Sequence, residues 1–234
     1  MHDPLGRAEG LATIEAPPAQ DCAGSQKRLF HGHAPRKPHS GHDVRRARRI
    51  SGSGMAMLRQ PQAGGAVVFI GDSISERAKL PASICGHAVV NAGISGSYAR
   101  QYADFVRAAG RLYPAERPAM VVIAIGVNDA HRDLAGGDFA TDYARLVDTM
   151  ARTGARIVLA TPTPLQEGPV AEPYDPERWS AIRDAIGSLA KMRGLPLADL
   201  SDVRGSVDGV HLSPAGYSAW MPAIVGTAEA SLCR

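Results

Sequence analysis

Short apolar runs alternate with helical stretches along the chain from residue 66 onward. The apolar runs are each followed by Gly, Pro, Asp or Ser, which is typical of buried strands that end in turns. We expect strands at 66–70, 88–91, 119–125, 156–160 and 195–200. The pattern also predicts helices at 74–80, 98–112, 139–153, 176–193 and 213–230. Strands that alternate with helices in this way are typical of βαβ units, so the sequence predicts an α/β domain with three α/β/α layers.

The first 64 residues lack this pattern. They are rich in Pro, Gly, His and Arg, and they show neither a helical nor a strand period. We therefore expect a disordered basic tail at 1–64 and a single folded domain at 65–234. Met55 and Met57 precede the first strand, so an alternative is that residues 1–54 reflect the choice of start site. Peptides from before Met55, found by mass spectrometry in the native host, would exclude that alternative.

Composition and charge narrow the class of protein. The 234 residues are 44% hydrophobic and 21% charged, as in soluble globular proteins. The net charge is +3, but residues 1–60 hold ten Lys/Arg against five Asp/Glu, whereas the rest holds 16 against 18. Because the domain itself is slightly acidic, nucleic acid is not an expected partner. We see neither a membrane span nor a secretory signal. Gly, Ser, Met and Gln follow the arginine cluster at 45–49 where a twin-arginine export signal needs apolar residues, so we expect a cytoplasmic protein.

The three cysteines give no sign of a metal site or of a disulfide framework. Cys22, Cys85 and Cys233 show no CxxC or Cys/His ligand spacing, and an odd number cannot all pair within one chain. We therefore expect neither a bound metal nor a disulfide framework. Four histidines of the tail also lack the paired carboxylates or cysteines that a metal site needs; they are His31, His33, His39 and His42.

A serine follows the first predicted strand, in the run Gly71-Asp72-Ser73-Ile74-Ser75. Ligands of open parallel sheets bind beyond the carboxyl ends of the strands. A hydroxyl at this strand-to-helix turn therefore faces the expected binding crevice. The alternative is a turn without catalytic function, in which Ser73 caps the next helix.

An acid and a histidine follow the last predicted strand, as Asp208 and His211. A carboxylate three residues before a histidine can accept the ring Nδ1–H and leave Nε2 as general base toward a serine. Ser213 and Pro214 come next and form a good helix start, which would hold His211 at the end of a short loop. The alternative is a loop histidine paired with the neighbouring acid.

Small and amide residues follow the second and third predicted strands. Gly96 is the last residue of an Asn-x-x-x-x-Gly run that begins at Asn91, and Asn128 lies in Gly126-Val-Asn-Asp. A glycine lets its N–H approach a substrate oxygen, and an asparagine amide offers an uncharged donor, so both suit an oxyanion hole. Either segment alone is better explained as a turn.

These residues in this order resemble the SGNH (GDSL-like) hydrolase family over residues 66–217. The namesake residues of the family correspond to Ser73, Gly96, Asn128 and His211. The resemblance implies a flavodoxin-like sheet of five parallel strands and ester hydrolysis without a metal or cofactor. It also implies an oxyanion hole made by the Ser73 N–H, the Gly96 N–H and the Asn128 side chain. Ile74 replaces the leucine of the Gly-Asp-Ser-Leu motif, and either apolar side chain can pack under the turn.

Other polar and aromatic residues have simpler explanations. We expect His131 to be a solvated loop residue rather than part of the rim of the site. We expect Asp129 to support its loop and Asp72 to be a turn or helix-start residue. Trp179 and Trp220 fall on predicted helices and suit packing. The segment 161–176 holds five prolines and follows the fourth strand, so it is either a wall that limits the substrate or a plain connector.

The sequence therefore predicts a serine esterase with Ser73 as nucleophile and Asp208 and His211 as its base pair. A small-molecule or carbohydrate ester with a short acyl or O-acetyl group is the expected substrate. Two alternatives stay open: an acyltransferase that uses the same residues, and a non-catalytic binding module of the same fold. Acyl chain length, the alcohol and the oligomeric state have no readable code in the sequence.

Overall fold

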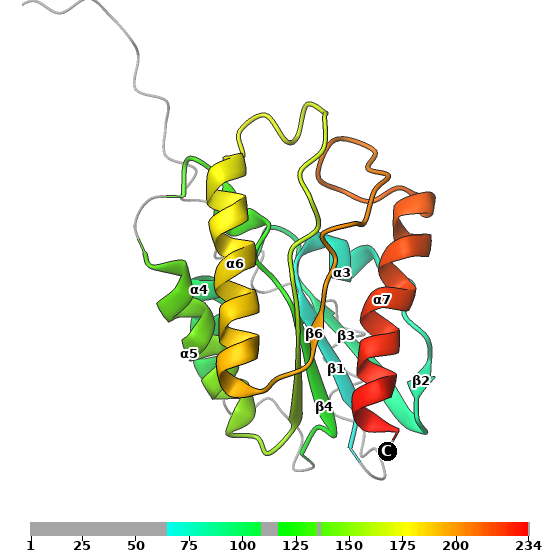
Figure 1. Ribbon diagram of the computed structural model, residues 1–234. Coiled ribbons are helices and arrows are strands. Elements are labelled where there is room, and N and C mark those ends of the chain that lie inside the picture. The colour runs from blue at the N-terminus through cyan, green and yellow to red at the C-terminus, as the bar shows by residue number, and fades with distance from the viewer. Residues whose placement is uncertain (1–64, 109–116, 135–136, 234) are drawn as a thin grey trace, which may run out of the picture. The chain divides into compact units, whose positions relative to one another are not determined.

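The computed structural model describes residues 65–108, 117–134 and 137–233 (Figure 1). The predicted tail, its four histidines, Met55, Met57 and Cys22 lie outside these residues. The prediction of a disordered tail is therefore not tested.

The domain is built on one sheet, which has six strands in the described part of the chain. Their order is β2-β3-β1-β4-β5-β6. Five of them run parallel, as predicted: β1 (Val67–Gly71), β3 (His87–Gly93), β4 (Met120–Ala124), β5 (Arg156–Ala160) and β6 (Leu197–Ala198). The sixth, β2 (Ser83–Ile84), pairs antiparallel with β3 at the edge. The sequence analysis did not predict β2, because two residues carry no measurable period.

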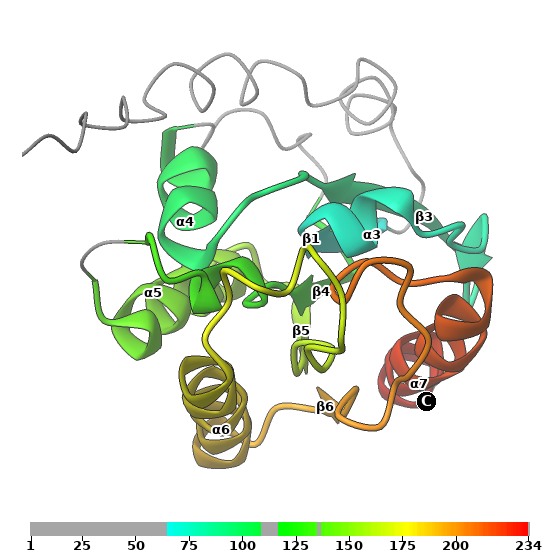
Figure 2. The same ribbon diagram turned by 90° about the horizontal axis from the view of Figure 1, so that it is seen from above.

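Helices cover both faces of this sheet, which confirms the predicted three layers. The helices are α3 (Ser73–Arg77), α4 (Ala99–Ala108), α5 (Phe139–Ala151), α6 (Pro176–Arg193) and α7 (Pro214–Leu232), and a 3₁₀ turn, η1, spans Asn128–Ala130. Helices α4, α5 and α6 lie on one face, and α3 and α7 lie on the other (Figures 1 and 2). None of the helices described is long and apolar enough to cross a membrane.

The central strands β1 and β4 are buried, and their carboxyl ends lie at the same level of the sheet. Each residue of 67–70 and of 120–123 is at most 1% exposed, because helices cover both faces of β1 and β4. Gly71 is paired with Gly93 on one side and with Ala124 on the other. Three neighbouring strands therefore end at one level, and the loops that follow them start side by side.

Local capping sets the ends of the two longest helices. Asp175 accepts hydrogen bonds from the first N–H groups of α6, and Gly194 ends that helix in the left-handed conformation. Ser213 caps α7 in the same way. These signals are local in sequence, so the predicted bounds of α6 are the observed ones.

A disulfide bond joins Cys85, beside β2, to Cys233, at the end of α7. The two Cα atoms are 5.5 Å apart, although 148 positions separate the residues. The sequence analysis expected no disulfide framework and did not predict this single bond. An odd number of cysteines leaves one over but still allows one pair, and the contact between α7 and the sheet edge brings these two together.

We predict that this disulfide stabilises the fold by constraining the unfolded chain. Replacing both cysteines, as Cys85→Ser with Cys233→Ser, is expected to lower the free energy of unfolding by about 2–4 kcal/mol. Urea unfolding of the wild type and the double variant measures this, and reductant should affect only the wild type. Equal stability with and without reductant would contradict the prediction.

Candidate active site

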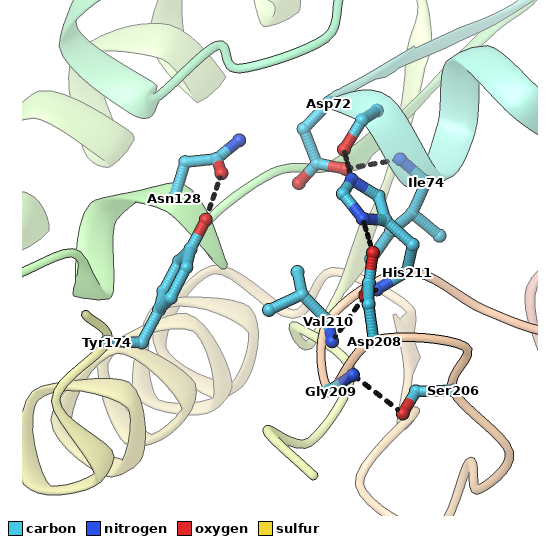
Figure 3. Close-up of polar contacts among 10 residues, drawn as sticks. Asp72, Ile74, Asn128, Tyr174, Ser206, Asp208, Gly209, Val210 and His211 are labelled. Atoms are coloured by element: carbon cyan, nitrogen blue, oxygen red, sulfur yellow. Dashed lines mark hydrogen bonds and ion pairs between the residues drawn. The ribbon is translucent and has the colours of Figure 1, made fainter. Parts of the chain in front are cut away.

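Ser73, His211 and Asp208 form a continuous hydrogen-bonded chain. The Nε2 atom of His211 lies 3.0 Å from Ser73 Oγ, and its Nδ1 lies 2.7 Å from Asp208 Oδ2. When the Nδ1–H donates a hydrogen bond to the carboxylate, Nε2 carries no proton and accepts a hydrogen bond from the serine hydroxyl. Figure 3 shows the imidazole of His211 directed at the carboxylate of Asp208. The structure thus brings together three residues that the sequence analysis selected from opposite ends of the domain.

The carboxylate of Asp208 holds its own turn as well as the imidazole. Its Oδ1 accepts from the backbone N–H of Val210 at 3.1 Å and of His211 at 2.8 Å (Figure 3). Burial raises the pKa of Asp208, but the hydrogen bonds from these N–H groups and from the His211 ring outweigh it and leave the pKa below its usual value. The carboxylate is therefore charged at neutral pH.

The loop that carries His211 is closed at its base. Ser206 and Leu212 form an isolated antiparallel bridge, and Val207 N–H donates to the His211 carbonyl at 2.8 Å. Gly209 supplies the turn, with a φ of 97° that favours glycine. The two sides of this loop therefore hold the backbone of His211 in place.

Ser73 is the first residue of α3, directly after β1, and it is only 5% exposed. Asp72 precedes it and caps the helix, because its Oδ1 accepts from Ile74 N–H at 2.9 Å. The prediction that Asp72 begins a helix is confirmed. The cap leaves the hydroxyl of Ser73 free to meet His211.

The two glycines of the second loop have different surroundings. A Cβ on Gly93 would lie 2.3 Å from the backbone nitrogen of Glu76 in α3, so close packing accounts for this glycine. Gly96 lies farther along, in an exposed turn with a φ of 76°. Its proposed role as an oxyanion donor stays a prediction.

Asn128, at the start of η1, makes two side-chain hydrogen bonds. Its Nδ2 donates to the Ser97 carbonyl at 2.9 Å, and its Oδ1 accepts from the Tyr174 hydroxyl at 3.0 Å (Figure 3). An amide nitrogen has two protons, and the bond to Ser97 uses one. The other can donate to a ligand.

Hydrogen bonds connect the three loops that follow β1, β3 and β4. Ser97 Oγ donates to the Gly71 carbonyl at 3.2 Å, and the Ser97 carbonyl accepts from Asn128. Both carboxylate oxygens of Asp129 accept from Ala99 N–H at 3.1 Å, at the start of α4. Asp129 therefore supports its loop, as predicted.

Two carboxyl groups beside the site are buried. Asp72 is 2% exposed and Asp129 is 5% exposed. Burial raises the pKa of Asp72 to about 7, against a lowering by the Ile74 N–H. Burial also raises the pKa of Asp129 to about 7, with a further contribution from Asp72 and an opposing one from Ala99 N–H. The fold therefore favours a proton on both groups.

The other predicted residues have structural partners. His131 is half-buried rather than fully solvated, and its ring meets the Tyr174 ring edge to face with centroids 5.2 Å apart. Trp220 is fully buried, and Trp179 donates to the Thr163 carbonyl, so both tryptophans pack as expected.

Tyr174 is the residue of this site that the sequence analysis missed. It lies in the proline-rich segment after β5, and we call residues 161–175 the strap. The one available signal was its place two residues before the start of α6, in a segment that follows a parallel strand. Nothing in that pattern identifies Asn128 as the partner.

Comparisons with known proteins agree with this geometry. A sequence model described as the GDSL-like lipase/acylhydrolase family matches residues 69–219. Esterase TesA of Pseudomonas aeruginosa is 28% identical over 185 residues, which cover 71% of this chain and 89% of TesA. A GDSL-like lipase from Bacteroides thetaiotaomicron superposes with a TM-score of 0.61 at 23% identity, over 79% of this chain and 97% of that one. Est24, a carbohydrate acetylesterase from Sinorhizobium meliloti, has a TM-score of 0.58 at 16% identity, over 71% and 99%. The structural likenesses confirm the predicted α/β fold.

We predict that the buried carboxyls make the fold less stable as the pH rises from about 4 to about 7. Their pKa is near 3.8 in the unfolded chain and about 7 in the fold. The folded state therefore holds protons that the unfolded state has lost, and this stabilising effect disappears as the pH passes the folded pKa.

Asp72→Asn keeps a capping side chain but removes the charge. Between pH 4 and 7 it should lose less unfolding free energy than the wild type, by about 1 kcal/mol or more. Urea unfolding at several pH values measures this. Asp175→Asn makes the same change at the cap of α6 and serves as control. Parallel pH curves for the wild type and Asp72→Asn would show that Asp72 does not titrate in this way.

Proposed function

The chain belongs to the GDSL-like lipase/acylhydrolase family and is a carboxylic ester hydrolase; on that premise we propose that it works through an acyl-enzyme on Ser73. The observation that carries the proposal is the hydrogen-bonded chain from Ser73 Oγ through His211 to Asp208, with distances of 3.0 and 2.7 Å. These are the contacts that a serine nucleophile and its base need before substrate arrives. They also speak against a binding module without catalysis.

In the acylation step, Ser73 Oγ attacks the ester carbonyl carbon while its proton passes to His211 Nε2. Asp208 holds the imidazole in the tautomer that can accept this proton, and its charge stabilises the imidazolium that forms. The lowered pKa of Asp208 supports this role, because the carboxylate stays charged near neutral pH. The tetrahedral intermediate then collapses, and the alcohol leaves with the proton from His211.

The developing oxyanion needs donors that already point at it. We assign this role to the backbone N–H groups of Ser73 and Gly96 and to the second Nδ2 proton of Asn128. The hydrogen bond from Asn128 to the Ser97 carbonyl supports the assignment, since it connects the loop after Gly96 with the loop of Asn128. Such donors require no reorganisation during the reaction.

Deacylation repeats the chemistry with water. His211 takes a proton from a water molecule, the hydroxide adds to the acyl carbon, and the collapse returns the proton to Ser73 Oγ as the acid leaves. In an acyltransferase, an alcohol would replace this water. The same residues would serve both reactions, so only the acceptor differs.

For the substrate, we propose an ester with a short acyl group, such as an O-acetyl group on a carbohydrate. The fold is shared with Est24 of Sinorhizobium meliloti, which is named as a carbohydrate acetylesterase. Esterase TesA of Pseudomonas aeruginosa shares sequence as well, and its name specifies an esterase without an acyl length. Acyl length is therefore the property to measure first.

A panel of 4-nitrophenyl esters with acyl chains from two to twelve carbons tests this proposal. We expect the largest kcat/KM for the shortest chains and no activity above background for Ser73→Ala. A fluorophosphonate probe should label the wild type and not that variant. Addition of candidate alcohols to the assay distinguishes transfer from hydrolysis by the product formed. Labelling of the variant as strong as that of the wild type would exclude Ser73 as nucleophile.

The oxyanion assignment predicts that Asn128→Ala lowers kcat by roughly 10²- to 10³-fold, the usual cost of one such donor. KM should change little, because the donor acts mainly on the transition state. Circular dichroism and thermal unfolding check that the variant is folded. A folded Asn128→Ala enzyme with wild-type kcat would exclude the residue from the oxyanion hole.

A further inference from the structure

The middle of the strap contacts the loop that carries Asp208 and His211. Gln166 N–H donates to the Gly209 carbonyl at 2.8 Å, and Val170 N–H donates to the Asp208 carbonyl at 3.0 Å. In Figure 1 the strap is the yellow-green segment beyond the strand ends, beside the orange loop that leads into α7. Residues 161–175 therefore lie directly against the turn that holds His211.

The end of the strap contacts the loop of Asn128 by backbone hydrogen bonds. Arg132 N–H donates to the Pro173 carbonyl at 2.9 Å, and Asp175 N–H donates to the Ala130 carbonyl at 2.9 Å. These two bonds flank Tyr174 on both sides. The backbone of Tyr174 is therefore fixed against the turn in which Asn128 lies.

The Tyr174 side chain is fixed as firmly as its backbone. The residue is 8% exposed, and its ring and that of His131 meet edge to face. Burial, and then the charges of Asp72 and Asp208, raise the pKa of Tyr174, so the hydroxyl keeps its proton over the working pH range. A buried phenol that keeps its proton is a permanent hydrogen-bond donor.

This donor meets the one acceptor of the Asn128 amide, Oδ1, at 3.0 Å. On the other side, Nδ2 donates to the Ser97 carbonyl. With both ends of the amide held, its plane cannot rotate, and the second Nδ2 proton keeps one direction. A hydrogen bond accepted at Oδ1 also polarises the amide and strengthens donation from nitrogen.

We propose that Tyr174 is a positioning residue for the oxyanion hole, which acts through Asn128 and does not touch the substrate. This inference rests on the proposed function, since it assumes that Asn128 donates to the oxyanion. It gives a residue of the strap an indirect part in the reaction. The middle of the strap thereby supports the turn of the general base, and its end holds the oxyanion donor Asn128.

The test is a double-variant cycle with 4-nitrophenyl acetate as substrate. Tyr174→Phe removes only the hydroxyl and should lower kcat roughly 5- to 10-fold with KM unchanged, as for the loss of one neutral hydrogen bond. In the Asn128→Ala background the same change should alter kcat less than about twofold, because the group on which it acts is absent. A boronic acid that forms a tetrahedral adduct should bind Tyr174→Phe more weakly by a similar factor.

Tyr143→Phe is the matched control. It removes another buried tyrosine hydroxyl, which lies 3.4 Å from the Ile123 carbonyl in the core. Any loss of stability should appear in both variants, whereas the loss of kcat should appear only in Tyr174→Phe. Unfolding curves for all variants show that the rates compare folded enzymes.

Two results would overturn the inference. One is an equal loss of kcat in the wild-type and Asn128→Ala backgrounds, which would mean that Tyr174 acts independently of Asn128. The other is a change confined to KM, which would place Tyr174 in substrate binding. Failure of the proposed function looks different, because Ser73→Ala would then keep activity and probe labelling.

Discussion

The hydrogen bond between Ser73 and His211 is the contact on which the site depends, and it joins residues 138 positions apart. It forms because strands β1 and β6 belong to one parallel sheet, so that their carboxyl ends face the same edge. The loop after β1 holds the hydroxyl, and the loop that leads into α7 holds the imidazole. Reversing either strand would move the loop that follows it to the opposite edge of the sheet.

The surroundings of this contact combine charged and uncharged carboxyls. Asp208 lies near the surface, accepts three hydrogen bonds and stays ionised. Asp72 and Asp129 are buried and hold their protons up to about neutral pH. A second negative charge directly beside Ser73 would oppose the development of an oxyanion. The fold thus keeps one carboxylate ionised behind the imidazole and favours the neutral form of the other two.

The elements that hold the site lie outside the residues that carry the chemistry. Helix α7 begins three residues after His211 and is fixed at its far end by the disulfide between Cys233 and Cys85. The strap binds the turn of Asp208 and the turn of Asn128 through backbone hydrogen bonds. Helix α7 and the strap both adjoin loops, which are the parts of an α/β fold with the fewest packing constraints. The hydrogen bonds of the strap hold the turn of the base and the turn of the amide before substrate binds.

The sequence by itself determined most of what depends on near neighbours; the exception is the two-residue strand β2, which pairs with the adjacent strand β3 but is too short to show a period. The five parallel strands, the five helices and the bounds of α6 follow from apolar periodicity and capping residues, and Asp208 and His211 are close enough in the chain for their pairing to be inferred. The tertiary structure alone decided the contacts between distant segments: the bond of Tyr174 to Asn128 across 46 positions and the pairing of Cys85 with Cys233. The physical reason is that such contacts depend on the path of irregular loops. Those paths result from many weak hydrogen bonds and packing contacts together, and no single residue pattern encodes them.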